Sequence, residues 1–66
     1  MDVWSILEHG GGKTLAVSRE DVLNKLQALA RERGSWYIER LHVSDSDGNR
    51  YLPAVAEDGS VELVLR

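Results

Sequence analysis

Residues 18–34 constrain the fold more than any other part of the chain, because they have the pattern of an amphipathic helix with a start signal and a stop signal. The hydroxyl of Ser18 can cap the helix by accepting a hydrogen bond from a free N–H of the first turn. Gly34 can adopt the left-handed conformation that often ends a helix. We therefore predict a helix of about fifteen residues. Its apolar side is formed by residues that recur at three- and four-residue intervals, namely Val22, Leu23, Leu26, Leu29 and Ala30.

Five short segments flank this helix and have the composition of β-strands, rich in apolar, aromatic and β-branched residues. They cover residues 3–8, 13–17, 36–43, 50–56 and 61–66. Asp58-Gly59 lies between the last two segments and is typical of a two-residue hairpin loop. Pro53 has no N–H to donate, so we expect it at a sheet edge or at a bulge.

This order of elements predicts an α+β fold in which residues 1–66 form one small domain. We expect the order β-β-α-β-β-β, with the single amphipathic helix packed on an antiparallel sheet of about four to five strands. One helix is too small to cover both faces of such a sheet. We therefore expect the second face either to curl on itself or to meet a partner. The apolar residues that motivate this expectation are Val3, Trp4, Ile6, Leu7 and Val64.

The chain has 66 residues and no cysteine, so its core must be stable without disulfides. A domain of this size buries only about 60% of the surface that its unfolded chain exposes. His9 and His42 are too few to form a four-ligand zinc site, and we expect no metal and no other cofactor. Self-association is the remaining aid to stability. The expected partner is therefore a second copy of the chain or another protein.

Composition also bears on location and on the class of partner. The absence of cysteine fits a reducing compartment and favours a small bacterial protein of the cytoplasm. No segment approaches the ~20 apolar residues of a membrane span, so we expect no membrane partner. The net charge is −3, and residues 34–66 carry three Lys or Arg against six Asp or Glu. This balance argues against nucleic acid as a partner, because nucleic-acid-binding proteins usually carry a basic stripe.

Two segments match known binding loops only in part. Residues 10–14 read Gly-Gly-Gly-Lys-Thr, the end of a phosphate-binding loop, but Leu7 stands where the first glycine is needed. Residues 45–49 contain Asp and Gly as a calcium loop does, yet Val43 and Ala54 would occupy two of its ligand positions. We interpret both segments as turns.

Aromatic residues are the best candidates for a binding surface. We predict an interface formed by Trp4, Trp36, Tyr37, Tyr51 and Val64, because Trp and Tyr are enriched at protein interfaces. One alternative places some of the rings on a strand face that stacks on nucleic-acid bases. The other places them in the core.

These observations predict a non-enzymatic protein-interaction or accessory module that self-associates. The alternative is a nucleic-acid-binding or regulatory domain that uses an aromatic strand face. The spacing of His9 and His42 relative to the serines does not favour a nucleophile with its base, so we predict no catalytic residue.

Overall fold

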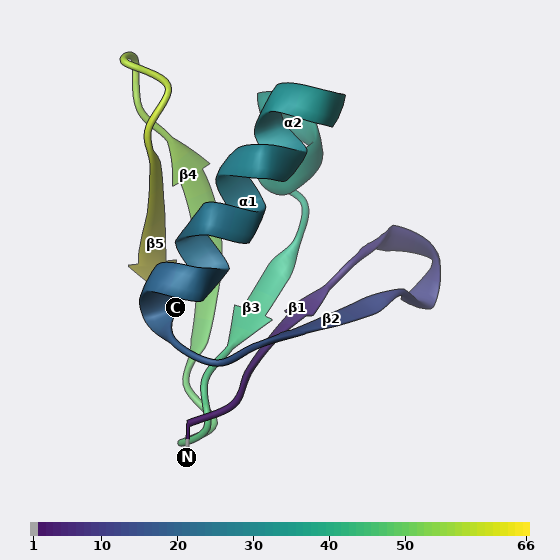
Figure 1. Ribbon diagram of the computed structural model, residues 1–66, viewed down its shortest axis with the longest axis vertical. Helices are drawn as coiled ribbons and strands as arrows, with labels where there is room; N and C mark the ends of the chain where they lie inside the picture. The colour runs from purple at the N-terminus through teal and green to yellow at the C-terminus, as the bar shows by residue number, and fades with distance from the viewer. Residues whose placement is uncertain (1) are drawn as a thin grey trace.

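The computed structural model describes residues 2–66, apart from the side chain of His9. The elements are β1 (Trp4–Leu7), the 3-10 turn η1 (His9–Gly11), β2 (Lys13–Ala16), α1 (Arg19–Arg33), α2 (Ser35–Ile38), β3 (His42–Ser44), β4 (Arg50–Val55) and β5 (Val61–Leu65). The strands form one five-stranded antiparallel sheet in the order β2-β1-β3-β4-β5, and α1 crosses one of its faces (Figure 1). The predicted α+β class and the order of its main elements are confirmed, and α2 is an addition.

Helix α1 begins and ends where its signals predict. The Ser18 hydroxyl accepts a hydrogen bond of 3.0 Å from the N–H of Asp21, which satisfies one of the free donors of the first turn. At the other end, the N–H of Gly34 donates to the carbonyl of Ala30 at 2.9 Å. Gly34 has a φ of 93° and a ψ of 157°, so it ends the helix with a positive φ but an extended ψ.

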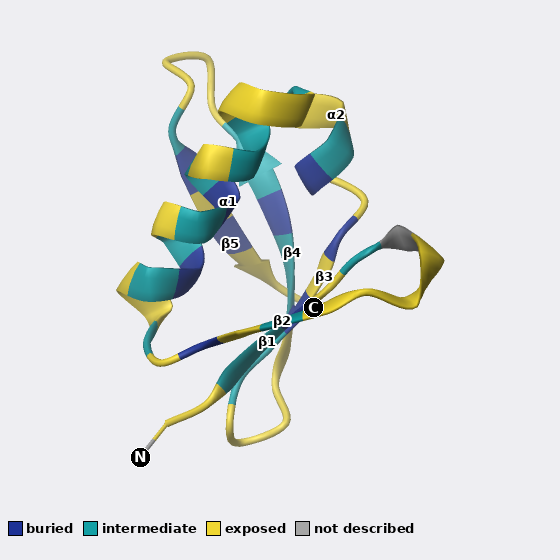
Figure 2. Ribbon diagram, turned by 45° about the vertical axis from the view of Figure 1, so that its right-hand side comes forward, coloured by how far each residue is buried: buried dark blue, intermediate teal, exposed yellow. Residues whose placement is uncertain are grey.

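The core lies between α1 and the sheet, where the buried segments of both face each other (Figure 2). Val22 and Leu26 are the residues of α1 that are completely buried. The whole buried cluster consists of Ile6, Ala16, Val22, Leu26, Ile38, Leu41, Val43, Val61 and Leu63. Because it draws on α1, on α2 and on four of the five strands, removing one of these side chains weakens several contacts between elements.

The strand predicted over residues 36–43 is wrong in its first half, where the chain forms α2. Ile38 and Leu41 are both completely buried. In a strand, residues three apart point to opposite faces, whereas a helical turn places them on the same side. The N–H of Leu41 donates to the carbonyl of Ile38 at 3.0 Å, which continues the turn beyond α2. Burial of both side chains therefore outweighs the β propensity of the aromatic residues.

Pro53 stands at a local sheet edge, as predicted. Along one side of β4, pairing with β3 ends at Tyr51. On the other side the ladder to β5 continues, with Pro53 opposite Leu63. Pro53 therefore lies where a further hydrogen bond to β3 would need an N–H that proline lacks.

One geometry recurs in the three turns at residues 8–12, 45–49 and 56–60. In each, the N–H of the first residue donates to the carbonyl of the fifth, at 2.7, 3.0 and 2.9 Å respectively. The N–H of the fourth residue donates back to the carbonyl of the first. That fourth residue is Gly11, Gly48 or Gly59, with a φ of 93°, 88° or 89°.

This arrangement is a three-residue hairpin loop with a glycine at positive φ. The predicted two-residue loop at Asp58-Gly59 is therefore wrong, because the chain closes one residue earlier, between Ala56 and Ser60. The two segments that partly match binding loops are hairpin turns, as interpreted. Lys13 and Thr14 begin β2, whereas a phosphate-binding loop requires a helix at that point.

Candidate interaction surface

Helix α1 covers one face of the sheet and leaves the other face open. Alternate residues of a strand point to opposite faces, and residues directly opposite each other on paired strands share a face. Ile6 and its partner Val43 are buried in the core. The residues on either side of them along each strand therefore point away from α1. We call this second side the uncovered face. It carries Ser5, Leu7, Lys13, Leu15, His42, Ser44, Arg50, Leu52, Ala54, Glu62 and Val64.

Large aliphatic side chains are exposed on the uncovered face. The exposed fraction is 45% for Leu7, 59% for Leu15 and 51% for Val64, and Leu52 is half-buried. On the opposite face of β5, Leu65 is 62% exposed, because the core does not extend to this end of the strand. Three of the exposed large hydrophobic side chains thus lie on the uncovered face and a fourth on the edge strand β5, while Val3, Val17 and Trp36 are exposed elsewhere. Exposed apolar side chains that share one face are typical of contact surfaces.

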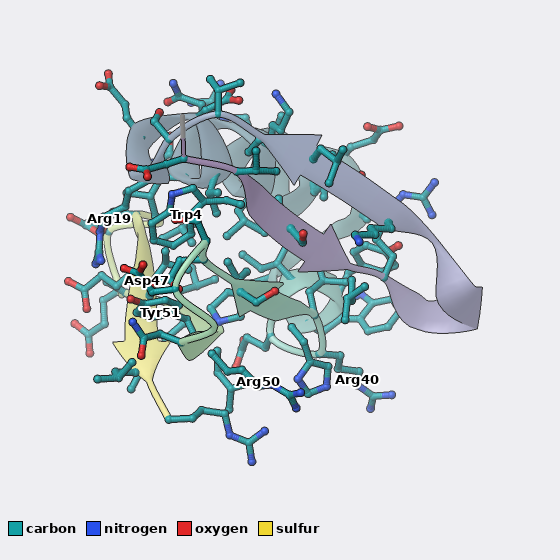
Figure 3. The ribbon with its side chains drawn as sticks, turned by 90° about the horizontal axis from the view of Figure 1, so that it is seen from below. Trp4, Arg19, Arg40, Asp47, Arg50 and Tyr51 are labelled. Carbon is teal, nitrogen blue, oxygen red and sulfur yellow. The ribbon has the colours of Figure 1, made fainter. Side chains whose placement is uncertain are left out.

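The charge on the uncovered face differs from that of the chain as a whole. Lys13, Arg50 and Arg66, which lies beside Arg50, are its basic residues and Glu62 is its acidic residue, while the chain has a net charge of −3. Figure 3 shows the side chain of Arg50 extending away from α1, with Arg40 on the same side of the sheet. A hollow of about 250 Å³ lies beside Arg50, and its lining residues include Leu7 and His42. The uncovered face therefore combines aliphatic patches with a basic centre.

Trp4 and Tyr51 lie on the face that α1 covers. Trp4 is opposite the buried Ala16, and Tyr51 is opposite the buried Val43. Their ring centroids are 5.5 Å apart, and the guanidinium of Arg19 lies 5.9 Å from the Tyr51 ring, so the three side chains form a group at one end of the sheet (Figure 3). Both rings are partly buried against the core. The two rings therefore lie on the opposite face of the sheet from Val64.

Trp36 and Tyr37 form a second aromatic pair, on α2. The rings meet edge to face with their centroids 5.9 Å apart. Arg40 lies 5.8 Å from the Trp36 ring and Arg33 lies 5.1 Å from the Tyr37 ring. Tyr37 packs partly against the core and its hydroxyl donates to Glu8 at 3.4 Å, whereas Trp36 is 61% exposed.

The five residues predicted at an interface therefore do not form one patch. Val64 lies on the uncovered face, Trp36 is exposed on α2, and the other three rings contact the core. Leu15 and Leu52 were not among the predicted residues although they share the uncovered face with Val64. The sequence Lys-Thr-Leu-Ala of β2 has no alternation of apolar and polar residues that would identify Leu15, and the alternation of exposed and less exposed residues is a property of the folded strand.

The polar groups of the turns are engaged within the turns. The Asp45 carboxylate accepts hydrogen bonds from the N–H groups of Asp47 and Asn49, from Asn49 Nδ2 and from the Tyr51 hydroxyl, at 2.9, 2.9, 3.1 and 3.0 Å. Desolvation alone would raise the pKa of Asp45, but these hydrogen bonds outweigh it and lower that pKa. The hydrogen bond that the Tyr51 hydroxyl donates to Asp45 raises the pKa of Tyr51. Within residues 2–66, no group of three or more His, Cys, Asp or Glu residues could hold a metal ion.

Comparison with protein-family models, with curated proteins and with solved structures finds no match to this chain. Any proposal about function therefore depends on the chain's own surface. In the part of the chain that the structure describes, no helix has both the length and the apolar character needed to cross a membrane.

Proposed function

We propose that this chain is a non-enzymatic protein-interaction module that self-associates through the part of the sheet that α1 leaves open. The observation that carries the proposal is the exposure of Leu7, Leu15 and Val64 on the uncovered face. Single exposed aliphatic residues are common on monomers. Three of them on one sheet face, with Leu65 exposed nearby, favour a contact surface instead.

Self-association is favoured over other partners by the size of the chain. The 66 residues include no cysteine, and the buried cluster is small. Domains of this size have a small core and are usually helped by a covalent link, a metal or a subunit contact. A symmetric dimer is the commonest subunit arrangement. We also propose a cytoplasmic location, since a chain without cysteine is suited to a reducing compartment.

The nucleic-acid alternative receives less support from the arrangement of the rings. Stacking on bases needs aromatic side chains on an open strand face. Trp4 and Tyr51 lie on the face that α1 covers, and Trp36 lies on α2. Arg40 and Arg50 are the basic groups that such a function would use, and a steep loss of affinity with salt would reveal it.

Light scattering on a size-exclusion column, with three forms of the chain, tests the proposal. The unmodified chain should elute with twice the monomer mass of 7.4 kDa at the upper end of the micromolar range. Val64→Lys, which places a charge on the uncovered face, should shift the mass toward the monomer. Ala28→Lys is the matched control, because Ala28 is an exposed residue of α1. A monomeric mass for the unmodified chain would overturn the proposal.

A further inference from the structure

The sheet has two edge strands, β2 and β5, and they differ in how well they are protected against pairing with another strand. Lys13 stands on β2, and an edge lysine is a common device that prevents such pairing. Strand β5 reads Val-Glu-Leu-Val-Leu over five residues and contains neither Lys nor Pro. Its Val64 and Leu65 are both more than half exposed. Strand β5 is therefore the edge better suited to pair with another strand.

The hydrogen bonds between β4 and β5 determine which groups of β5 are free. The N–H of Arg66 donates to the carbonyl of Arg50 at 3.0 Å. In an antiparallel ladder, alternate residues direct their N–H and C=O groups to the same neighbour. Glu62 and Val64 therefore bond to β4, while the backbone groups of Val61, Leu63 and Leu65 point outward from the sheet edge.

We propose that two copies of the chain join β5 to β5, antiparallel, about a two-fold axis at Val64. This proposal rests on the proposed self-association and narrows the contact to the β5 edge of the sheet. Val64 lies at this contact, whereas Leu7 and Leu15 stay outside it. The outward-pointing groups of Leu63 in one copy face those of Leu65 in the other, which forms about four hydrogen bonds between the two chains. Val64 faces its own counterpart across the axis.

Charge complementarity selects this register. With the axis at Val64, Glu62 of each copy lies directly opposite Arg66 of the other, on the uncovered face. An axis at Glu62 would instead place the two Glu62 carboxylates opposite each other, which is unfavourable. An axis at Leu63 would place Glu62 opposite Val64 and leave its charge without a partner. A register shifted by a single residue is excluded. The backbone groups of one copy that bond to β4 would then lie opposite the outward-pointing groups of the other copy.

The pairing also gives a place to the exposed side chains of β5. Leu65 lies opposite Leu63 of the second copy, on the side of the sheet where α1 packs, and the two Val64 side chains meet on the uncovered face. The two sheets become one continuous sheet. Their uncovered faces then lie side by side and form a wider surface with the exposed Leu7 and Leu15 of both copies.

A cysteine at the axis tests the register directly, because the chain has no cysteine of its own. Directly opposite residues in a non-hydrogen-bonded antiparallel pair have Cα atoms about 4.5 Å apart, within the range that a disulfide spans. Under mild oxidation, Val64→Cys should form a covalent dimer in most molecules at micromolar concentration. Leu15→Cys is the matched control, because Leu15 is at least as exposed as Val64 but lies on β2, and it should remain uncrosslinked over the same time.

Charge exchange provides a second, independent readout. Glu62→Arg should raise the dissociation constant of the dimer about tenfold or more, because two attractive pairs become two repulsive ones. The double variant Glu62→Arg/Arg66→Glu restores opposite charges and should return the constant to within about twofold to threefold of its original value.

The outcomes separate this inference from the proposed function. If the unmodified chain is a dimer but Val64→Cys crosslinks no faster than Leu15→Cys, the β5 pairing is wrong and self-association stands. A double charge variant that dimerises no better than Glu62→Arg would also overturn the register. If the unmodified chain is a monomer, both proposals fail.

Discussion

Asp45 organises the turn between β3 and β4 through its carboxylate. Its four hydrogen bonds come from Asp47, Asn49 and Tyr51, so one side chain fixes the turn and connects it to the first residues of β4. Each donor favours the ionised form of the carboxylate and lowers its pKa. Asp21 at the start of α1 and Asp58 in the last turn also have lowered pKa values, caused mainly by the hydrogen bonds from Lys25 and Ser60 respectively.

Acid should therefore destabilise the fold as these carboxyl groups take up protons. Because the folded pKa of these carboxyl groups lies below the ordinary value of 3.8, their contribution to stability is complete above that value and is lost as the pH falls through the folded pKa. Carboxyl titration by NMR should give Asp45 a pKa below 3.8. Asp45→Asn should lower stability at neutral pH and weaken the loss in acid, whereas Asp47→Asn leaves the turn's hydrogen bonds in place. An Asp45 pKa at or above the ordinary value would contradict this account.

Leu26 tests the core at the same scale. It is completely buried at the centre of α1, so Leu26→Ala removes three carbon atoms from a packed site. We expect a loss of about 2–5 kcal/mol in the free energy of unfolding, which is a large share of the stability of a small domain. Chemical denaturation measures it, with the exposed Leu15→Ala as the matched change outside the core. A loss below about 0.5 kcal/mol would show that Leu26 is not a core residue.

At the scale of elements, the three hairpin turns depend on glycine at one position. Gly59 has a φ of 89° and open space around it, so a side chain there meets backbone strain but no clash. Gly59→Val should cost about 1–2 kcal/mol, and Gly59→Asn should cost less because Asn tolerates positive φ. Gly11→Val should cost a similar amount, since Gly11 holds the equivalent position. Equal melting temperatures for Gly59→Val and the unmodified chain would contradict the turn geometry.

The elements also show which parts of the fold local sequence can determine. Helix α1 was predictable because its signals are local: the cap at Ser18, the apolar spacing and the stop at Gly34 all act within a few residues. The helical turn at the start of residues 36–43 was not predictable, because the need to bury both Ile38 and Leu41 arises from contacts with α1 and the sheet. The length of the last hairpin depends on the bond between Ala56 and Ser60, which lies outside the Asp-Gly pair that suggested the turn.

The candidate surface was predictable only in part, for a similar reason. An open sheet face follows from having one long helix and five strands. Which residues occupy that face depends on pairing register, and a strand shifted by one residue exchanges its faces. The aromatic composition indicated binding, but Trp4 and Tyr51 turn toward α1 because their neighbours Ala16 and Val43 are core residues.

At the scale of the whole molecule, stability and association should be linked. If folding and dimer formation are coupled, the melting temperature rises with protein concentration. For a chain of this length we expect an increase of about 2–5 °C for each tenfold increase in concentration. Circular dichroism at several concentrations measures it, and Val64→Lys should reduce the dependence. A melting temperature that does not change with concentration would indicate that the folded unit is the monomer.

The central claim is that the open part of the sheet is a contact surface between copies of this chain. Sedimentation equilibrium of the unmodified protein tests it most directly, because the method measures mass without reference to shape. Across the micromolar range we predict a reversible change from the 7.4 kDa monomer to a species of twice that mass. A folded protein that remains at the monomer mass throughout this range would contradict the claim.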